Sequence, residues 1–244
     1  MEPALSVKGL SIGYGRHQVL EDAELTLEED EILAVLGPTG SGKTTLLRAI
    51  AGLEQPAGGE IRLKGRTIFG KGIDIAPEKR GIGMVFQDLA IWPHMSVGEN
   101  IGFSSKSDAK ETERILNTMM LEGLTSRMPS TLSGGQRQCV AIARAIASKP
   151  EVLLLDEPFT NLDWRIKEDL FDLLIRLRDE YRMPMIFVTH DQFEALSVAD
   201  AFVAITDGRT ERYEDAEELR RKPPEWFLPN MAPVRLRRDK GQTA

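Results

Sequence analysis

Cysteine is almost absent from the sequence, with Cys139 the only one among 244 residues. A single cysteine forms no internal disulfide, and such scarcity fits a protein that works in a reducing compartment. The residues around it, QRQCVAIARAIA, are apolar or helix-forming. Because nothing there forms the exposed, basic niche that activates a thiol, we expect Cys139 to be a buried structural residue.

Long apolar segments are also missing. No run approaches the ~18 residues that a membrane-spanning helix needs. The first residues, MEPALSVKGL, lack the basic and then apolar pattern of a signal peptide. The sequence therefore predicts no membrane anchor of its own. If the chain works at a membrane, a partner protein must hold it there.

An excess of positive charge is lacking as well, since the formal net charge is -7. Broad surfaces that bind a nucleic-acid backbone need clustered Lys and Arg, so no nucleic-acid partner is expected. The proportions of hydrophobic residues (41%) and charged residues (28%) are ordinary for a soluble globular protein. A local anion site remains open, because helix N-termini and backbone amides bind phosphate without an overall basic charge.

Apolar runs and helical patterns alternate along most of the chain, which predicts an α/β fold with a parallel sheet covered on both faces. The strands expected from the pattern lie within 5–27 and at 32–36, 60–63, 83–86, 152–155 and 185–188. The helices expected are 43–51, 136–148 and 166–181.

The domain organisation follows from one interruption of this alternation. The segment at about 88–135 is helix-like and Met-rich, so it is interpreted as an inserted helical subdomain. We expect a single domain over 1–230, with its core at about 1–87 and 136–230. Residues 231–244 form a short basic tail, which is interpreted as a frayed end rather than a binding arm.

The segment Gly37–Thr44, GPTGSGKT, matches the phosphate-loop pattern G-x-x-x-x-G-K-[ST] between a predicted strand and a predicted helix. In this pattern glycines let backbone amides converge on an anion, and the helix that follows presents its positive end. Lys43 supplies a point charge, and the Thr44 hydroxyl is a ligand for Mg²⁺. A glycine-rich turn is the alternative interpretation, but a chance match in this length is on the order of 1%.

A phosphate loop needs an acidic partner for the metal, and the apolar strand 152–155 is followed by two acids. Asp156 is expected to hold Mg²⁺ through water. Glu157 is expected to polarise the attacking water as a general base, a role worth about 10²–10⁴ in rate. Apolar strands often end in acids, so the pair is informative only beside the phosphate loop.

The segment Leu132–Gln136, LSGGQ, resembles the signature motif of ABC ATPases and opens a predicted helix at Gln136. A chance match is on the order of one in a few thousand, although Ser-Gly-Gly alone is an ordinary turn. The resemblance implies a homodimer whose two subunits stack head to tail. Each ATP then lies between the phosphate loop of one subunit and the signature of the other, where Ser133 and the helix N-terminus contact the γ-phosphate.

Further motifs of this family match in order along nearly the whole chain. Tyr14, in Gly-Tyr-Gly, resembles the aromatic residue that stacks on adenine. Gln87 resembles the glutamine that reaches Mg²⁺ and the attacking water and links them to the helical subdomain. Thr160–Asp163 resembles the loop that crosses the dimer interface, and His190 resembles the switch histidine that contacts the γ-phosphate.

The motifs and the resemblance together predict one composite site with three groups of residues. The catalytic residues are expected to be Glu157, His190, Gln87 and Lys43, and the Mg²⁺ ligands Thr44, Gln87 and Asp156. The residues expected to contact ATP are Tyr14, Gly37, Pro38, Thr39, Gly40, Ser41, Gly42, Lys43, Thr44, Thr45, Ser133, Gly134, Gly135, Gln136 and Asp163.

The resemblance also implies a fold, a function and partners. The fold is a P-loop NTPase (RecA-like) α/β core with an antiparallel β subdomain and an inserted α-helical subdomain. The phrases GIGMVFQDLAIWPHMSVGENI, DEPFTNLD and HDQFEALSVAD look most like importer ATPases for polyamines, ferric iron, sulfate and related solutes. Such a subunit hydrolyses ATP on the cytoplasmic side of the membrane. It binds integral-membrane permease subunits and acts indirectly with a periplasmic or external solute-binding protein.

The sequence departs from the family pattern at three points. Asn161 stands where the interface loop usually has Ala, and Phe193 stands where a polar residue usually follows His-Asp-Gln. Many relatives carry a further C-terminal β-rich regulatory domain, which is not expected here because the sequence stops near where it would begin.

Other functions fit the motifs less well. The ATPase subunit of an ABC exporter remains an alternative, although the sequence around Gln87 and His94 favours an importer. A soluble ABC ATPase that acts on DNA or ribosomes would usually show a coiled-coil insertion, zinc cysteines or two fused cassettes. A kinase or GTPase would not need Leu132–Gln136, and a non-catalytic regulatory cassette would be expected to lose Lys43, Glu157 or His190.

Overall fold

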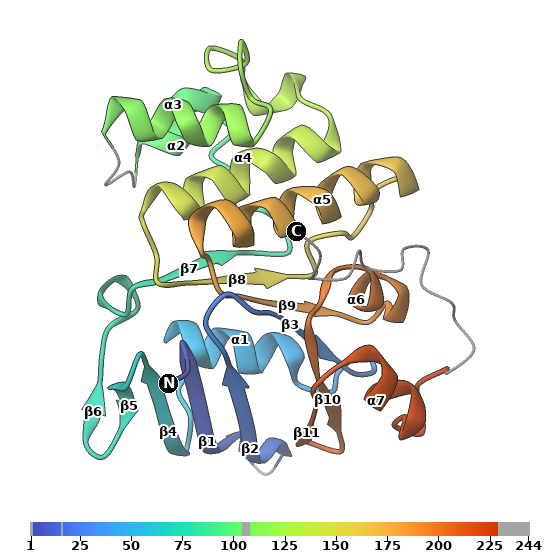
Figure 1. The fold of residues 1–244 in the computed structure, drawn as a ribbon. Coiled ribbons are helices and arrows are strands. Elements are labelled where there is room, and N and C mark those ends of the chain that lie inside the picture. Colours follow the sequence, from blue (N-terminus) through green and yellow to red (C-terminus); the bar gives the residue numbers. More distant parts are fainter. Residues whose placement is uncertain (1, 16, 104–107, 229–244) are drawn as a thin grey trace, which may run out of the picture.

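The computed structural model describes residues 2–15, 17–103 and 108–228, which form two sheets and the helices that cover them (Figure 1). One sheet is antiparallel, in the order β2-β1-β4-β5-β6, and the other has the order β11-β10-β3-β9-β8-β7. The predicted tail 231–244 lies outside the described residues. No helix among those described is long and apolar enough to cross a membrane.

The antiparallel sheet is built from the N-terminal part of the chain. Its strands are β1 (Leu5–Tyr14), β2 (His17–Leu27), β4 (Gly58–Leu63), β5 (Arg66–Gly70) and β6 (Ile73–Asp74). Buried and less buried residues alternate along β1, as they do in a strand with one face on the core. The strands expected within 5–27 and at 60–63 are confirmed. β5 and β6 were not predicted, because both are short and lack a long apolar alternation.

The second sheet carries the core of the domain. Its strands are β3 (Ile32–Leu36), β7 (Ile82–Val85), β8 (Val152–Asp156), β9 (Met185–Thr189), β10 (Ala201–Thr206) and β11 (Arg209–Tyr213). All neighbours pair in parallel except β10 and β11, which are antiparallel. Every residue of β3, β8 and β9 is buried, which confirms the expectation of a parallel sheet covered on both faces.

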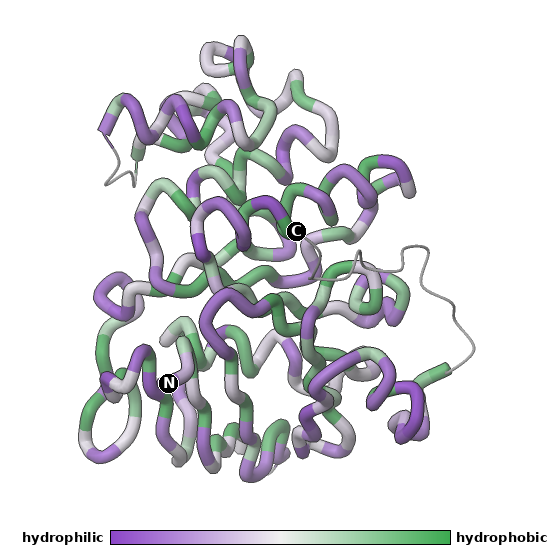
Figure 2. Tube along the Cα trace, in the orientation of Figure 1, coloured by the Kyte–Doolittle hydropathy of each residue, from purple (hydrophilic) through white to green (hydrophobic). Residues whose placement is uncertain are grey.

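Helices cover this sheet on both faces, as Figure 1 shows. α1 (Lys43–Ala51) lies on one face, between the two sheets, and packs there with Leu33 and Val35 of β3. The opposite face of β3 packs with α4 (Gly134–Ala147) and α5 (Trp164–Tyr181). The short helices α6 (Gln192–Val198) and α7 (Ala216–Arg221) follow later in the chain. Hydrophobic residues, green in Figure 2, run along the central strands between these layers.

The interrupting segment 88–135 is less helical than predicted. It contains α2 (Val97–Gly102), α3 (Ala109–Thr118) and a 3₁₀ turn at 129–131, joined by irregular chain. The helix expected to start at 136 begins at Gly134, because Ser133 caps it. α2 and α3 pack on α4, which also contacts β7, so α4 joins the helical segment to the sheet.

Candidate functional site

The phosphate loop connects the carboxyl end of β3 to the amino end of α1. Gly40 and Gly42 have φ angles of 82° and 101°, a left-handed conformation that glycine adopts without steric cost. The ammonium group of Lys43 donates hydrogen bonds of 2.8 Å to the carbonyl oxygens of Gly37 and Pro38. The loop is therefore closed on its own lysine, with Pro38, Thr39 and Gly40 exposed at its crest.

Two side chains of the loop are buried polar groups. Lys43 is 5% exposed, and burial lowers its pKa, while the nearby carboxylates of Glu157 and Asp156 act in the opposite direction. The Ser41 hydroxyl is buried and has no hydrogen-bond partner among the described residues. An unpaired buried hydroxyl costs free energy, so its position beside exposed backbone amides indicates that the loop is built to hold a polar ligand.

Asp156 is the last residue of β8 and lies beside the start of α1. Its Oδ1 atom accepts a hydrogen bond of 2.8 Å from the Thr44 hydroxyl. The side chain is 1% exposed, and burial raises its pKa above the usual value. The fold therefore brings together two of the predicted Mg²⁺ ligands, from segments more than a hundred residues apart.

Replacing Asp156 by Asn is expected to stabilise the nucleotide-free chain at neutral pH. A raised folded-state pKa means that the folded chain holds this proton more tightly than the unfolded chain does. Stability therefore falls as the pH rises through the interval between the unfolded and folded pKa values, and the ionised carboxylate carries that cost at neutral pH. Asn retains an oxygen for the Thr44 hydroxyl without the charge. We expect Tm to rise by about 2–4 °C, which corresponds to about 1 kcal/mol.

This stability effect is measured by thermal unfolding without nucleotide or metal between pH 8 and pH 5. The gain should shrink as the pH falls toward the folded pKa, because the wild-type carboxyl then becomes protonated. Asp169→Asn, at an exposed position of α5, is the control and should leave Tm unchanged. A lower Tm for Asp156→Asn at pH 8 would contradict the argument.

Glu157 is the centre of a cluster at the carboxyl ends of β7, β8 and β9. Its Oε2 atom accepts hydrogen bonds from Gln87 Nε2 (3.3 Å) and from the Thr160 hydroxyl (3.1 Å). The Nδ1 atom of His190 lies 3.4 Å from Oε1. The backbone at Glu157 is left-handed, with φ 46°, although the residue is not glycine. Such strain persists only where the surroundings hold it, and it is common at functional sites.

The cluster places several predicted residues together. Gln87, Glu157 and His190 come from three separate motifs and meet at one carboxylate. Gln87 contacts Glu157 rather than the pair formed by Thr44 and Asp156. The side chain of Glu157 is 19% exposed, whereas that of His190 is 56% exposed. The arrangement presents a carboxylate that is partly screened from water, next to an imidazole that faces solvent.

Tyr14 lies at the end of β1 and is 52% exposed. Hydrogen bonding to the Glu54 carboxylate raises the pKa of its hydroxyl. A separate cavity of about 560 Å³ runs beside the phosphate loop, and Tyr14 is not among the residues that line it. Its walls are formed by residues 17–19 of β2, residues 38–41 of the loop, residues 205–208 at the end of β10 and the turn that follows it, and Glu225 and Trp226. The volume lies within the range of small-molecule sites.

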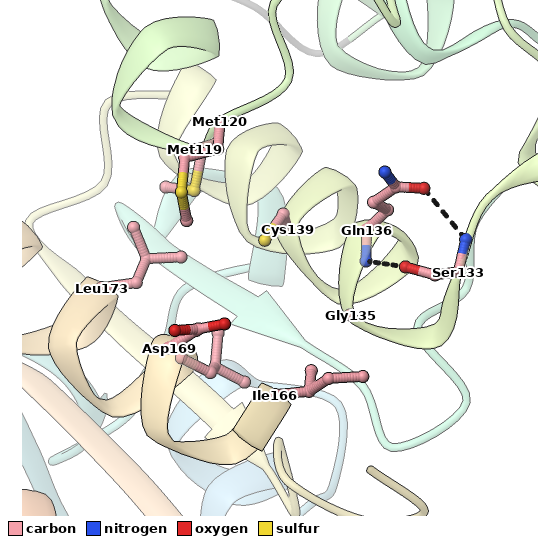
Figure 3. Close-up of a pocket in the computed structure, with 10 residues that line it drawn as sticks. Met119, Met120, Ser133, Gly135, Gln136, Cys139, Ile166, Asp169 and Leu173 are labelled. Carbon is pink, nitrogen blue, oxygen red and sulfur yellow. Dashed lines mark hydrogen bonds between the residues drawn. The ribbon is translucent and has the colours of Figure 1, made fainter. Parts of the chain in front are cut away.

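The signature segment opens α4, on the sheet face opposite α1. Ser133 and Gln136 form a reciprocal capping box, with hydrogen bonds of 3.2 Å and 3.0 Å between each side chain and the other's backbone N–H (Figure 3). A Cβ atom at Gly135 would lie 2.6 Å from Cγ2 of Ile166, so glycine lets α4 approach α5. Among the described residues, no hydrogen bond links this segment to the phosphate loop.

A cavity of about 230 Å³ lies behind the signature segment, between α4, α5 and the end of α3. Figure 3 shows Met119 and Met120 on one side of it and Ile166, Asp169 and Leu173 of α5 on the other. Cys139 also lines it. Cys139 is partly buried rather than fully buried as expected, but burial raises the pKa of its thiol to about 11, which disfavours the reactive thiolate.

Some residues around the cluster were not predicted as site residues. Lys167 of α5 and Glu194 of α6 form an ion pair of 2.7 Å, and the Glu194 carboxylate also accepts a hydrogen bond from the hydroxyl of Thr189, the residue before His190. Trp226 lines the cavity beside the phosphate loop. None of these stands in a phosphate-loop or signature pattern, and the ion pair joins residues 27 positions apart, so spacing gave no signal.

Comparison with known proteins places these motifs in one family. A family model described as ABC transporter matches residues 20–160. The sulfate/thiosulfate import ATP-binding protein of Bacillus cereus is 41% identical over 236 residues, which cover 92% of this chain and 65% of that protein. The spermidine/putrescine import ATP-binding protein of Pseudomonas aeruginosa is 40% identical over 234 residues, or 93% and 63% of the two chains. The chain thus spans slightly less than two thirds of these relatives.

Solved structures resemble the fold. An ATP-binding cassette of an ABC transporter in its ADP conformation superposes with a TM-score of 0.79 at 22% identity, covering 90% of this chain and 94% of that one. A dimeric ATP-binding cassette in a post-hydrolysis state, bound to ADP and Pi, gives a TM-score of 0.73 at 29% identity, with 86% and 98% covered. The predicted α/β cassette fold is confirmed.

Proposed function

Because the chain belongs to the ABC transporter family of ATP-binding proteins, we propose that it is the ATP-hydrolysing subunit of an importer for a small solute. The observation that carries the hydrolytic part is the cluster around Glu157, where side chains from three motifs converge on one partly buried carboxylate. The import part is supported by the names of the relatives, which are import ATP-binding proteins.

ATP is the proposed substrate, and the phosphate loop is its binding site. The backbone N–H groups of the exposed residues Thr39 and Gly40 and the unpaired Ser41 hydroxyl are proposed donors for phosphate oxygens. Lys43 is already held at the loop and supplies a positive charge to the phosphates. Tyr14, exposed at the end of β1, is proposed to stack on adenine, an interaction worth about 1–3 kcal/mol for bases on aromatic side chains.

The donor set at Asp156 fits Mg²⁺. Thr44 and Asp156 offer hard oxygen atoms at one point, and the described residues contain no cluster of three or more His, Cys, Asp or Glu that would hold a metal by itself. Mg²⁺ is usually held by one or two protein oxygens together with substrate phosphates and water. When bound, the ion would neutralise charge that develops on the phosphates. Gln87 is proposed to join this set from its place beside Glu157.

Glu157 is proposed to be the general base. In hydrolysis a water oxygen attacks the γ-phosphorus, the bond to the bridging oxygen of ADP breaks, and the water proton passes to the carboxylate. Thr160 and Gln87 hold the carboxylate from one side, and His190 lies at its other oxygen, facing the solvent where the γ-phosphate would enter. The residues thus orient the base before the substrate arrives, which limits the rearrangement needed during the reaction.

The signature segment is proposed to complete the site of a second copy. It lies on the sheet face opposite α1, so we propose that Ser133 and the N-terminus of α4 contact ATP held by the partner's phosphate loop. Asp163, exposed at the end of the interface loop, is proposed to lie in the same dimer interface. In such a closed homodimer, the phosphate loop of one copy and the signature segment of the other together supply the predicted contacts to ATP.

The proposed docking surface for a permease lies around α2. Phe103, which follows α2, is 66% exposed and its ring stands 4.4 Å from that of Trp92. The guanidinium of Arg144 lies 4.6 Å from the centre of the Trp92 ring, and it also donates to the carbonyl oxygens of Leu89 and Ala90. Leu89, Ala90 and Trp92 of this surface come shortly after Gln87 in the chain, so a permease segment seated here would be linked to the nucleotide site on the cytoplasmic side of the membrane.

The test is to purify the chain with its native membrane partners after gentle solubilisation and to identify the proteins that accompany it. We expect two copies of the chain with a permease of one or two subunits, and an ATPase rate that rises when the solute-binding protein is added to the reconstituted complex. Phe103→Ser tests the proposed docking surface. This variant should lose the permease but keep the basal ATPase activity. Recovery with ribosomes or DNA, and without a membrane protein, would refute the transporter role.

A further inference from the structure

The first turns of α5 and α6 are joined by two side-chain contacts. Lys167 Nζ lies 2.7 Å from Glu194 Oε1, and both side chains are largely buried, at 18% and 6% exposure. One turn earlier on α5, the ring of Trp164 stands 4.7 Å from that of Phe193 in an edge-to-face arrangement. We call these four residues, Trp164, Lys167, Phe193 and Glu194, the α5–α6 clasp.

The clasp holds the backbone on both sides of His190. The second carboxylate oxygen of Glu194 accepts a hydrogen bond from the hydroxyl of Thr189, and that hydroxyl accepts a hydrogen bond of 3.0 Å from the Asp191 N–H. Thr189 is 1% exposed. His190 itself is 56% exposed, so its place beside Glu157 depends on how its two neighbours are held.

On the α5 side, the clasp is continuous in the chain with the interface loop. α5 begins at Trp164, directly after Thr160–Asp163, and the Thr160 hydroxyl bonds to Glu157. A closed circuit of contacts therefore runs from Glu157 through the loop and α5 to Glu194, and back through Thr189 and His190 to Glu157. Because these contacts are continuous, a displacement of the loop is expected to move α5 and, through the clasp, the backbone at His190.

Stability alone is a weak reason for such a pair. The desolvation of a buried ion pair offsets most of its attraction, and apolar residues of the same volume often stabilise a fold equally well. A charged pair does fix one geometry, because two oxygen atoms of one carboxylate are assigned to two different donors, Lys167 and Thr189. Phe193, which departs from the polar residue usual at its position, adds a second contact to Trp164 at the same junction.

We infer that the α5–α6 clasp positions His190 against Glu157 according to the placement of the interface loop. Lys167 and Glu194 are positioning residues in this scheme, and they act on the reaction through His190. The inference rests on the proposed ATPase function for its kinetic consequence, but the positioning of His190 is a property of the chain alone.

The kinetic test uses Glu194→Gln and Lys167→Met in the full chain. We expect kcat for ATP hydrolysis to fall about 10- to 100-fold, because a misplacement of about 1 Å costs up to 10²-fold in rate. KM for ATP should stay within about twofold, since the phosphate loop is untouched, and the Hill coefficient for ATP should fall toward 1. Lys167→Arg keeps the cation and should recover most of kcat.

Glu31→Gln is a matched control. Glu31 pairs with Arg212 at 2.8 Å with exposures of 11% and 22%, and its other oxygen accepts the Glu28 N–H, so its surroundings mirror those of Glu194. It precedes the amino end of β3, opposite the end that carries the phosphate loop. Glu31→Gln should lose about as much Tm as Glu194→Gln does, but its kcat should match that of the wild type. A kcat for Glu194→Gln equal to that of Glu31→Gln would overturn the inference.

A second readout needs no catalysis. The chain has three histidines, so ¹⁵N-histidine spectra separate His190 from His17 and His94 once His190→Asn assigns the signal. Glu194→Gln should shift or broaden the His190 signal and leave the other two in place; an unchanged His190 signal would overturn the inference. A wild type that does not hydrolyse ATP would refute the proposed function, and the spectra would still decide whether the clasp positions His190.

Discussion

Replacing Glu157 by Gln is expected to lower the rate of ATP hydrolysis about 10²–10⁴-fold, the range for loss of a general base. ATP affinity should be unchanged, because Glu157 takes no part in the loop formed by Lys43 and the Gly37 and Pro38 carbonyls. The amide has the size of the carboxylate and can still accept the hydrogen bond from Thr160, so the local backbone is expected to persist. Only the proton acceptor is removed.

A second consequence concerns assembly. If the closed dimer opens only after hydrolysis, then the variant with ATP and Mg²⁺ should accumulate as a dimer, whereas the wild type should return to monomer. Phosphate release under single-turnover conditions measures the rate, and size-exclusion chromatography with light scattering measures the mass. Glu151→Gln, one residue before β8 and away from its carboxyl end, is the control and should keep the wild-type rate. Near-normal turnover of Glu157→Gln would refute the general-base assignment.

The sequence predicted the core of the fold because local pattern and burial agree there. β3, β8 and β9 are continuous apolar runs, and such runs are stable only inside a sheet with helices on both faces. α1 was predicted with its correct ends, since the phosphate loop precedes it and Gly52 ends it in a left-handed conformation. The segment 88–135 was predicted less well, because its helices are short and are stabilised by packing on α4 rather than by their own periodicity.

In the candidate site, too, features with a local sequence pattern were predicted and features that depend on tertiary contacts were not. Motifs predicted which residues are candidates for contact with substrate, because that chemistry requires particular side chains at particular spacings. They did not predict the contacts among those residues. The pairing of Thr44 with Asp156 and the convergence on Glu157 come from the order of strands in the sheet, which places the carboxyl ends of β7, β8 and β9 side by side. Lys167 and Glu194 had no signal, since any two helices can meet through a Lys and a Glu.

Replacing Lys43 by Met is expected to change ATP binding strongly and stability little. The ammonium group is buried, and burial lowers its pKa, so the charged form is unfavourable in the folded chain below that pKa. Lys43→Met keeps the alkyl chain and removes this cost, against the loss of hydrogen bonds to the carbonyls of Gly37 and Pro38. We therefore expect the Tm of the nucleotide-free variant to stay close to that of the wild type.

ATP binding by Lys43→Met should nevertheless weaken by about 10- to 100-fold, because a hydrogen bond to a charged group contributes about 1.5–3 kcal/mol. Without a ligand, the desolvation of the ammonium group offsets its hydrogen bonds, whereas beside phosphate its charge is favourable, so the charge serves binding rather than folding. Calorimetric titration with ATP and Mg²⁺ measures the affinity. The control is Lys64→Met, at an exposed position in the turn between β4 and β5. A variant that binds ATP as tightly as the wild type would show that the loop amides and the Ser41 hydroxyl hold the phosphates without it.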